Sequence, residues 1–325
     1  MSTNHQRVAD EVARYYPIPT RDEINLLGRG RLRLQHFPAD RVIKEQSRFI
    51  RKCVARFEAK GILVGLSGGS DSSTLAMLAR RVALDSGFEA LTATLVARNP
   101  TKAESQDMEA ARALAARSCL NHIELDASEV IAAFDRCVSS SSVWGKINRS
   151  ARLRFDLLNC VAEDRGLLML DSINRSEYIL GAFTEPLGLI CPFLGLFKTE
   201  VRRLGKELGV PQSNLERDSV DSEKNVLTRE LYGAGWDVLD PVLYLLFDRK
   251  FSSRRVSRLL GHSNTWVQNI RQKRIEGQAH RRDLFHPLHP RLGLGDARMK
   301  DFFDHEVIHC QDEPEKRSKS KWQKN

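Results

Sequence analysis

The sequence predicts an α/β fold, in which helices cover both faces of a doubly wound parallel sheet and the C-terminal part is helical. The first observation behind this prediction is that short β-like runs alternate with helical stretches between residues 41 and 208. This is the pattern of parallel strands joined by crossover helices. The second is that β-like runs stop near residue 213, after which helical patterns dominate.

The first predicted element is a helix over residues 41–60, because its apolar residues recur mostly at helical spacing and Gly61 follows it. The aliphatic run Ile62–Leu66 has the length and composition of a buried strand. Further strands are expected at 91–98, 122–126 and 166–172, and further helices at 73–86, 102–117, 151–164 and 200–208. Because ligands of such sheets bind at the carboxyl ends of the strands, we expect the site to lie at this edge.

The composition is that of an ordinary globular chain, with 41% hydrophobic and 29% charged residues among 325. The net charge of +9 favours a polyanionic ligand, either a nucleotide or a nucleic acid. We expect no membrane span, because no apolar run reaches about 18 residues, and a cytoplasmic location, because residues 1–20 lack the order of a secretory signal. Six scattered cysteines without a CxxC pair predict small buried side chains rather than a zinc site or a disulfide framework.

The most informative stretch is GILVGLSGGSDSS at residues 61–73, a strand that breaks into glycines, serines and one carboxylate. Gly68 and Gly69 let the backbone approach an anion, and the amide groups at the start of the next helix favour negative charge. Ser67 and Ser72 add hydroxyl donors, whereas Asp71 would repel phosphate unless a metal ion lay between them. The stretch therefore predicts a site for pyrophosphate and Mg²⁺, although a glycine turn with an aspartate helix cap would have the same local sequence.

The segment LSGGSDSS resembles the SGGxDS loop of the N-type ATP pyrophosphatases, the PP-loop superfamily, which transfer AMP to a substrate and release pyrophosphate. Residues 171–211 are similar, motif by motif, to the ammonia-dependent NAD synthetases of that superfamily, and so are INRSARLRF at 147–155 and QAHRRDLF at 278–285. Because these motifs stand in the same order as in that family, the sequence is identified as a divergent member of it. The resemblance covers about residues 40–290.

The resemblance implies a Rossmann-like, adenine nucleotide alpha hydrolase-like fold. It implies an ATP pyrophosphatase domain over 41–290, between an N-terminal extension at 1–40 and a basic, flexible tail at 291–325. In the implied reaction a substrate carboxylate is adenylated by ATP with release of pyrophosphate, and ammonia then attacks to form an amide. ATP is the implied co-substrate, Mg²⁺ the implied metal and deamido-NAD the implied acid, which would become NAD. The family also implies a homodimer, and we expect neither a membrane nor a nucleic-acid partner.

The family's functional residues carry over only where this sequence matches its motifs. The resemblance implies a catalytic and metal-binding role for Asp71, a catalytic role for Lys198 and a metal-binding role for Glu177. It implies ATP contacts at Ser67, Gly68, Gly69, Ser72, Arg98, Gln106, Ser172, Lys198 and Ser219. Arg152 and Arg154 match arginines near the acid substrate. Because these two are two residues apart on one helix, they cannot share a stripe, and we expect only one to reach the ligand.

The acid-binding part of the family pattern is altered in this sequence. EPLGLIC at 185–191 is shorter than the family's loop and lacks its aspartates, and Gly195 stands where the family has an aspartate before its Leu-Tyr-Lys. Thr228 and Arg229 replace an acidic pair, and RNPTK at 98–102 replaces a Pro-Tyr-Gly turn. The sequence therefore leaves open an amide ligase that acts on a different carboxylic acid.

Other classes of function also stay open. Residues 252–275 have the composition of a helix-turn-helix that reads DNA, with Gly261–Asn264 as the turn and a basic second helix. Some PP-loop proteins modify tRNA, which a basic chain would suit, and a nucleotide-binding regulator without catalysis would also keep the loop. No glutaminase segment is recognisable, so we expect ammonia to be used free or supplied by a separate protein.

Overall fold

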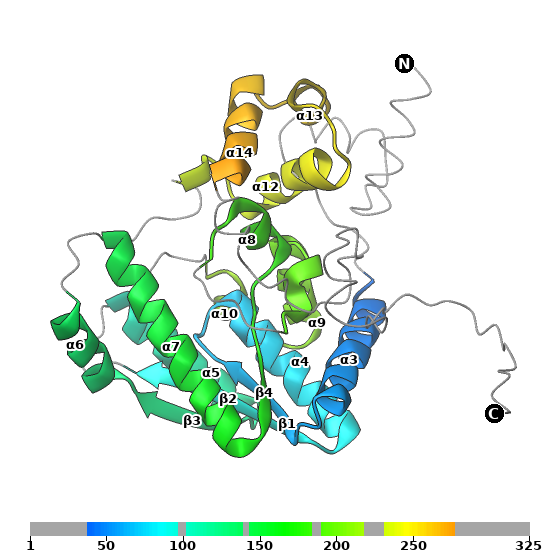
Figure 1. Cartoon of the computed structure of the whole chain (residues 1–325). Helices are drawn as coiled ribbons and strands as arrows, with labels where there is room; N and C mark the ends of the chain where they lie inside the picture. Colours follow the sequence, from blue (N-terminus) through cyan, green and yellow to red (C-terminus); the bar gives the residue numbers. More distant parts are fainter. Residues whose placement is uncertain (1–37, 97–101, 139–142, 184–189, 218–230, 277–325) are drawn as a thin grey trace, which may run out of the picture.

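A parallel sheet of four strands in the order β3-β2-β1-β4 lies at the centre of the fold (Figure 1). The computed structural model describes residues 38–96, 102–138, 143–183, 190–217 and 231–276. The strands are β1 (Gly61–Gly65), β2 (Glu89–Val96), β3 (Asn121–Asp126) and β4 (Leu167–Leu170). The chain runs outward from β1 to β3 and then returns to the other side of β1, so the strand order reverses between β1 and β4.

Helices cover both faces of the sheet, as the alternation of the sequence predicts. They are α3 (Ala39–Arg56), α4 (Ser70–Ser86), α5 (Lys102–Arg117), α7 (Val143–Arg165) and α9 (Lys198–Glu207). On one face, Ile62 and Val64 of β1 pack against α3, α4, α5 and α9. On the other, Leu63 packs against Leu158 and Ala162 of α7. Because neighbouring residues of a strand face opposite sides, one aliphatic run fills both layers, and the predicted doubly wound fold is confirmed.

The part after residue 231 is helical in the described range, which confirms the second half of the fold prediction. Its elements are α12 (Trp236–Leu243), the π-helix Tyr244–Asp248, α13 (Ser253–Leu260) and α14 (Asn264–Glu276). They share an apolar core with Phe197 and with α8 (Arg175–Leu180), above which they lie in Figure 1. Gly261, in the left-handed conformation at φ 72°, ends α13, so the helix, turn and helix expected over 252–275 are present.

Four helices begin earlier than predicted: α3 at Ala39, α4 at Ser70, α7 at residue 143 and α9 at Lys198. Gly69, with an extended backbone at φ −75° and ψ 170°, precedes α4. Asp71 and Ser72 therefore lie in the first turn of the helix and not in the loop before it. Four short elements have no counterpart in the predicted pattern: α6 (Ser128–Cys137), α8, α10 (Gln212–Leu215) and the 3-10 turn Pro192–Gly195.

The expectation that the cysteines are buried is wrong for three of the five that the structure describes. Cys53 and Cys191 are buried, but Cys119, Cys137 and Cys160 are exposed at helix ends or on a helix surface, and none of these five forms a disulfide within the described residues. Cys310 lies outside the described residues. A search of the described part for a helix long and apolar enough to cross a membrane finds none.

A glycine allows α9 to pack closely against α4. A Cβ atom on Gly205 would lie 2.3 Å from Thr74 Oγ1 and 2.7 Å from a methyl carbon of Leu215. A larger residue at this position would push α9 away from α4. Because the two helices start at Ser70 and Lys198, their close packing brings the first turns of both together, and this is where the candidate site lies.

Candidate active site

The loop between β1 and α4 has a shape that glycine alone permits at one position. Gly68 has φ +86°, and a Cβ atom there would lie 2.1 Å from the backbone oxygen of Asp107 on α5. Any side chain would therefore clash with backbone as well as being strained. The absence of a side chain at Gly68 thus lets the loop lie against α5. A glycine is therefore required here for packing, in addition to its predicted ATP contact.

The start of α4 presents donors to the space in front of it. Gly69, the residue before the helix, has no side chain with which to cap it, and the first amide groups of any helix have no acceptor within the helix. Ser67 and Ser72 are joined by a hydrogen bond of 2.9 Å between their hydroxyl groups, and the amide of Ser67 donates to Ser72 Oγ at 3.2 Å. The hydroxyls and amides are therefore held in one place, as an anion-binding site requires.

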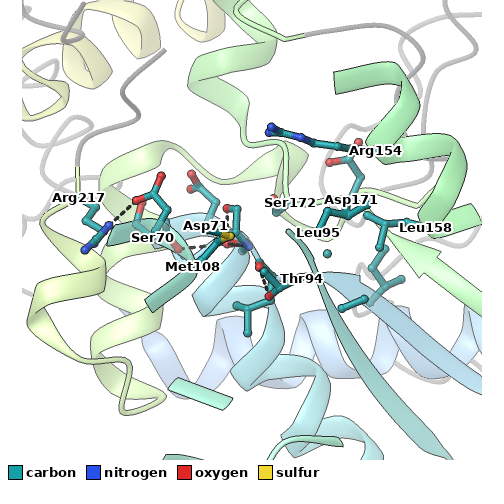
Figure 2. Close-up of a pocket in the computed structure, with 18 of the residues that line it drawn as sticks. Ser70, Asp71, Thr94, Leu95, Met108, Arg154, Leu158, Asp171, Ser172 and Arg217 are labelled. Carbon is teal, nitrogen blue, oxygen red and sulfur yellow. Dashed lines mark hydrogen bonds and ion pairs between the residues drawn. The ribbon is translucent and has the colours of Figure 1, made fainter. Parts of the chain in front are cut away.

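A cavity of about 430 Å³ opens in front of this helix start (Figure 2). Its polar end includes Ser67, Gly69, Asp71, Ser72, Asp171 and Ser172. Its apolar wall is formed by Leu66, Ala93, Leu95, Met108, Leu158 and Met169. The cavity lies at the carboxyl ends of β1, β2 and β4, where the strand order reverses, which is the usual ligand site of open α/β sheets.

Two arginines stand at opposite sides of the cavity in Figure 2, and one helix orients both. Arg154 of α7 donates to Glu104 of α5 at 3.2 Å, and Arg217 forms an ion pair with Asp107, also on α5. All four side chains line the cavity. The guanidinium groups are thus partly neutralised but remain beside a site that can take a polyanion.

Lys198 does not line the cavity and is almost completely buried, with 1% of its side chain exposed. Its ammonium group forms an ion pair with Asp71 and lies 3.4 Å from Glu177 Oε1. Asn174 also contacts this group, because its side-chain nitrogen Nδ2 donates to Asp71 Oδ1 at 3.3 Å. Three helices thus meet at one point: Asp71 comes from α4, Glu177 from α8 and Lys198 from α9.

The position of Glu177 is set by a capping box at the start of α8. The amide of Glu177 donates to Asn174 Oδ1 at 3.1 Å, and the amide of Asn174 donates to Glu177 Oε2 at 3.3 Å. This reciprocal pair fixes both side chains in the first turn. Asn174 therefore orients Glu177 and Asp71 at once.

The ionisation of the buried groups follows from their surroundings. Burial, reinforced by the charge of Asp71, raises the pKa of Glu177 to about 7, although Lys198 acts in the opposite direction. Burial by itself would lower the pKa of Lys198, but the charges of Asp71 and Glu177 outweigh it and raise that pKa overall. The lysine therefore stays charged and holds the two carboxyl groups together.

Asp71 and Glu177 fit the role of metal ligands by the chemistry of their donor atoms. Mg²⁺ is typically bound through one or two carboxylates together with substrate phosphates and water. Here two carboxyl groups from different helices converge on one cation, the ammonium group of Lys198. Within the described residues no group of three or more His, Cys, Asp or Glu side chains could hold a metal by itself, so phosphate would have to complete the set.

The other residues singled out from the sequence lie at varied distances from the cavity. Ser172 lines it just after β4, and Arg154 lines it whereas Arg152 is exposed and does not. That one of the two arginines reaches the ligand stays a prediction. Gln106 is exposed on α5 and does not line the cavity. Arg98 and Ser219 lie outside the described residues, so their roles stay predictions.

Sequence reasoning missed several residues of the site. Asn174 has a local signal, because an Asn followed three residues later by Glu is the pattern of a capping box. Arg217 and Asp107 have none, since their ion pair joins residues 110 positions apart. Asp171, directly after β4, could have been inferred from its place at a strand end.

This fold and this site define an α/β protein with a cavity at the carboxyl ends of its parallel strands, in front of a helix start. The family model described as NAD synthase matches residues 42–285, and the chain belongs to that family. A relative from Pyrococcus furiosus, named NH(3)-dependent NAD(+) synthetase, is 27% identical over 241 residues, which cover 72% of this chain and 89% of the relative. Another relative of the same name, from Hyperthermus butylicus, is 31% identical over 225 residues, which cover 68% of this chain and 80% of the relative.

Solved structures with the same fold agree with this membership. NH3-dependent NAD synthetase from Campylobacter jejuni has a TM-score of 0.60 at 20% identity and covers 74% of this chain and 95% of its own. NMN synthetase from Francisella tularensis has a TM-score of 0.59 at 24% identity, and the match covers 74% of this chain and 97% of the synthetase. At these identities the likeness shows the fold alone. The resemblance to NAD synthetases expected from the sequence is confirmed.

Glu177 should make the metal-free protein less stable as the pH rises. Its pKa is about 7 in the folded chain against 4.5 for an ordinary glutamate, so between these values the folded state binds more protons than the unfolded state. The free energy of unfolding should therefore fall by on the order of 1–3 kcal/mol across this range because of Glu177. Urea titrations of the wild type and Glu177→Gln in a chelator measure this, and a pH-independent difference between the two would contradict it.

Proposed function

We propose that the protein is an amide ligase that uses ATP and ammonia, with deamido-NAD as its acid and NAD as its product. The observation that carries the proposal is the buried contact of Lys198 with Asp71 in the first turn of α4, directly after the glycine loop. It places a fixed positive charge and a carboxylate suited to Mg²⁺ beside amide groups that favour phosphate. The family membership of residues 42–285 supports the same reaction.

In the proposed complex, the phosphates of ATP lie against the loop. The hydroxyls of Ser67 and Ser72 and the amide groups from Gly69 onward would donate to phosphate oxygens, since they already face the cavity together. The apolar wall of the cavity would receive the adenine ring. Ser172 would donate its hydroxyl from the end of β4, on the other side of the reversal in strand order.

The proposed chemistry needs no side-chain nucleophile. An oxygen of the substrate carboxylate attacks the α-phosphorus of ATP, and the bond to the pyrophosphate oxygen breaks, which gives an acyl adenylate and pyrophosphate. Ammonia adds to the acyl carbon, the bond to AMP breaks, and the nitrogen loses a proton to leave the amide. Lys198 would stabilise the charge that gathers on the leaving pyrophosphate. Mg²⁺ held by Asp71 and Glu177 would supply further neutralisation of that charge when bound, so positioning and electrostatics carry the rate.

A different carboxylic acid is the second candidate substrate, because the altered motifs lie on the acid side. Gly195 ends the 3-10 turn before Lys198 and offers no carboxylate where the resemblance has one. Most of the other altered motifs lie outside the described residues, in the ranges 97–101, 184–189 and 218–230. The residues proposed to bind the phosphates of ATP would be used in the same way with either acid.

Other functions have less support from the described residues. The tRNA-modifying and regulatory alternatives share the loop and stay untested. The helix-turn-helix alternative has its two helices, but Val256, Leu260, Val267 and Ile270 of these helices are buried in the apolar core that they share with α8. Packing therefore explains the pair without DNA. We also propose that ammonia comes free or from a separate protein, and that the reaction takes place in the cytoplasm, where ATP is available.

We further propose a homodimer that is formed through α6. Val130 and Phe134 of α6, and Val138 directly after it, are exposed by 42%, 39% and 46%. The spacing of four places Val130 and Phe134 on one side of the helix. No residue of α6 is buried. The helix lies at the outer edge of the structure beside α7 (Figure 1), and such a cluster of exposed apolar side chains is typical of an interface.

A charge in this apolar stripe should separate the dimer. Phe134→Glu would bury a carboxylate at the proposed interface, so we expect the variant to sediment as a monomer while the wild type sediments as a dimer. Leu84→Glu is the matched control, because Leu84 is a single exposed apolar residue on α4, with 69% exposure. A monomeric wild type, or a dimer that Phe134→Glu leaves intact, would contradict the proposal.

A pyrophosphate-release assay tests the proposed reaction and its acid. The purified chain is given ATP, Mg²⁺, ammonium and one carboxylic acid at a time, including deamido-NAD and its nicotinate mononucleotide half. We expect release with deamido-NAD, in amounts equal to the NAD formed. Release with only another acid would replace the proposed substrate, and no release with any acid would favour a regulator. Turnover with glutamine in place of ammonium would overturn the proposed nitrogen source.

Removing the charge of Asp71 should abolish metal-dependent turnover while leaving the fold intact. Asp71→Asn keeps the shape of the side chain but loses the carboxylate that pairs with Lys198 and would bind Mg²⁺, so kcat should fall by roughly 100-fold or more. Asp85→Asn, at the exposed far end of the same helix, should leave kcat unchanged. Circular dichroism checks the fold of both, and an unchanged rate in Asp71→Asn would exclude the proposed metal role.

A further inference from the structure

Lys198 and Glu177 both lie in the first turn of a helix. Lys198 is the first residue of α9, and Glu177 lies in the first turn of α8. A side chain in a first turn points where the start of the helix directs it, and the first amide groups of a helix need acceptors from outside the helix. Whatever holds the two helix starts together therefore also sets the positions of Lys198 and Glu177.

One buried carboxylate joins these two starts. Asp240 of α12 accepts a hydrogen bond from the Ser176 hydroxyl at 2.6 Å with one oxygen and from the Thr199 amide at 2.8 Å with the other. Ser176 Oγ in turn accepts from the amide of Lys198 at 2.9 Å. The first two amide groups of α9 thus reach the same carboxylate, one directly and one through Ser176, which stands next to Glu177.

Burial of the Asp240 carboxylate is energetically unfavourable, so its hydrogen bonds to Ser176 and Thr199 must compensate for the loss of water. The residue is completely buried, and so is Ser176. An unpaired carboxylate in an apolar core is strongly unfavourable, and it is tolerated where hydrogen bonds satisfy it. Burial raises the pKa of Asp240 to about 6, while the hydrogen bonds from Ser176 and Thr199 oppose that rise.

We propose that Asp240 is a positioning residue of the active site: it fixes the first turn of α9 to that of α8 and so holds the ammonium group of Lys198 between the carboxyl groups of Asp71 and Glu177. The effect of Asp240 on the reaction rests on the proposed function, whereas its contacts with Ser176 and Thr199 do not. It also gives the C-terminal helices a part in the reaction, since α12 supplies the carboxylate from outside the sheet and its covering helices.

The nearby pair of Arg175 and Asp248 provides a matched comparison. Arg175 of α8 donates from Nε to Asp248 Oδ2 at 3.1 Å and through a second nitrogen to Oδ1. This pair also ties α8 to the C-terminal helices, but among the described residues Asp248 has no hydrogen bond to α9. Loss of Asp248 should therefore weaken the same junction without releasing the start of α9.

The experiment compares Asp240→Asn with Asp248→Asn in the full chain. An asparagine at 240 has one oxygen for two donors, so either Ser176 or Thr199 loses its acceptor. We expect hydrogen exchange of the peptide that starts α9 to speed up by on the order of tenfold or more in Asp240→Asn and to stay near the wild-type rate in Asp248→Asn. In the pyrophosphate assay, kcat should fall roughly 10- to 100-fold in Asp240→Asn with KM for ATP changed by less than about threefold, and Asp248→Asn should keep the wild-type kcat.

Ser176→Ala keeps the question answerable if Asp240→Asn does not fold. It removes one hydroxyl and leaves the carboxylate bound to Thr199, so both effects should appear in the same direction but smaller. Equal exchange at the start of α9 in the 240 and 248 variants, or an unchanged kcat with faster exchange, would overturn the inference. If the wild type itself shows no turnover with any acid, the proposed function fails, and the exchange comparison alone still decides whether Asp240 fixes α9.

Discussion

The structure depends on one interaction, the ammonium group of Lys198 held between the carboxyl groups of Asp71 and Glu177. Burial of one positive charge is unfavourable, and burial of two carboxylates without a cation is worse, so none of the three can be stable there alone. Each comes from a different helix, and those helices must therefore begin at the same point in space. Three features hold the helix starts together: the close packing of α9 on α4 at Gly205, the capping box of Asn174 and the carboxylate of Asp240.

The sheet explains why this point lies beside a cavity. With β1 between β2 and β4, the loop after β1 stands where the strand order reverses, so no crossover helix covers the edge of the sheet there. Gly68 presses the loop against α5, and the same helix supplies Glu104 and Asp107, which orient Arg154 and Arg217. The positive charges around the cavity are thus prearranged before any ligand arrives, and an arrangement that needs little reorganisation is what transfer of a phosphoryl-type group requires.

Sequence reasoning succeeded where the signal is local and failed where contacts join distant segments. The aliphatic run Ile62–Leu66 and the helices around it follow from periodicity, and the glycine loop follows from composition. The start of α4 was placed three residues late, because Ser72 and Asp71 are typical capping residues while the true cap position is Gly69. Asp240 gives no signal at all in the sequence. An aspartate in an amphipathic helix normally faces water, and only the packing of α12 on α8 and α9 reveals that it does not.

The split between kept and altered motifs has a physical reason. Breaking the bond to pyrophosphate poses the same electrostatic problem whichever acid attacks, so the residues that we propose for this task, Lys198 and its two carboxyl partners, need not change with the acid. Recognition of the acid depends instead on groups at the far side of the α-phosphorus, and a polar group missing there costs affinity for one substrate without affecting the phosphate end. The buried core of the site can therefore stay unchanged while Gly195 and its surroundings change, and family membership constrains the phosphate chemistry more strongly than the identity of the acid.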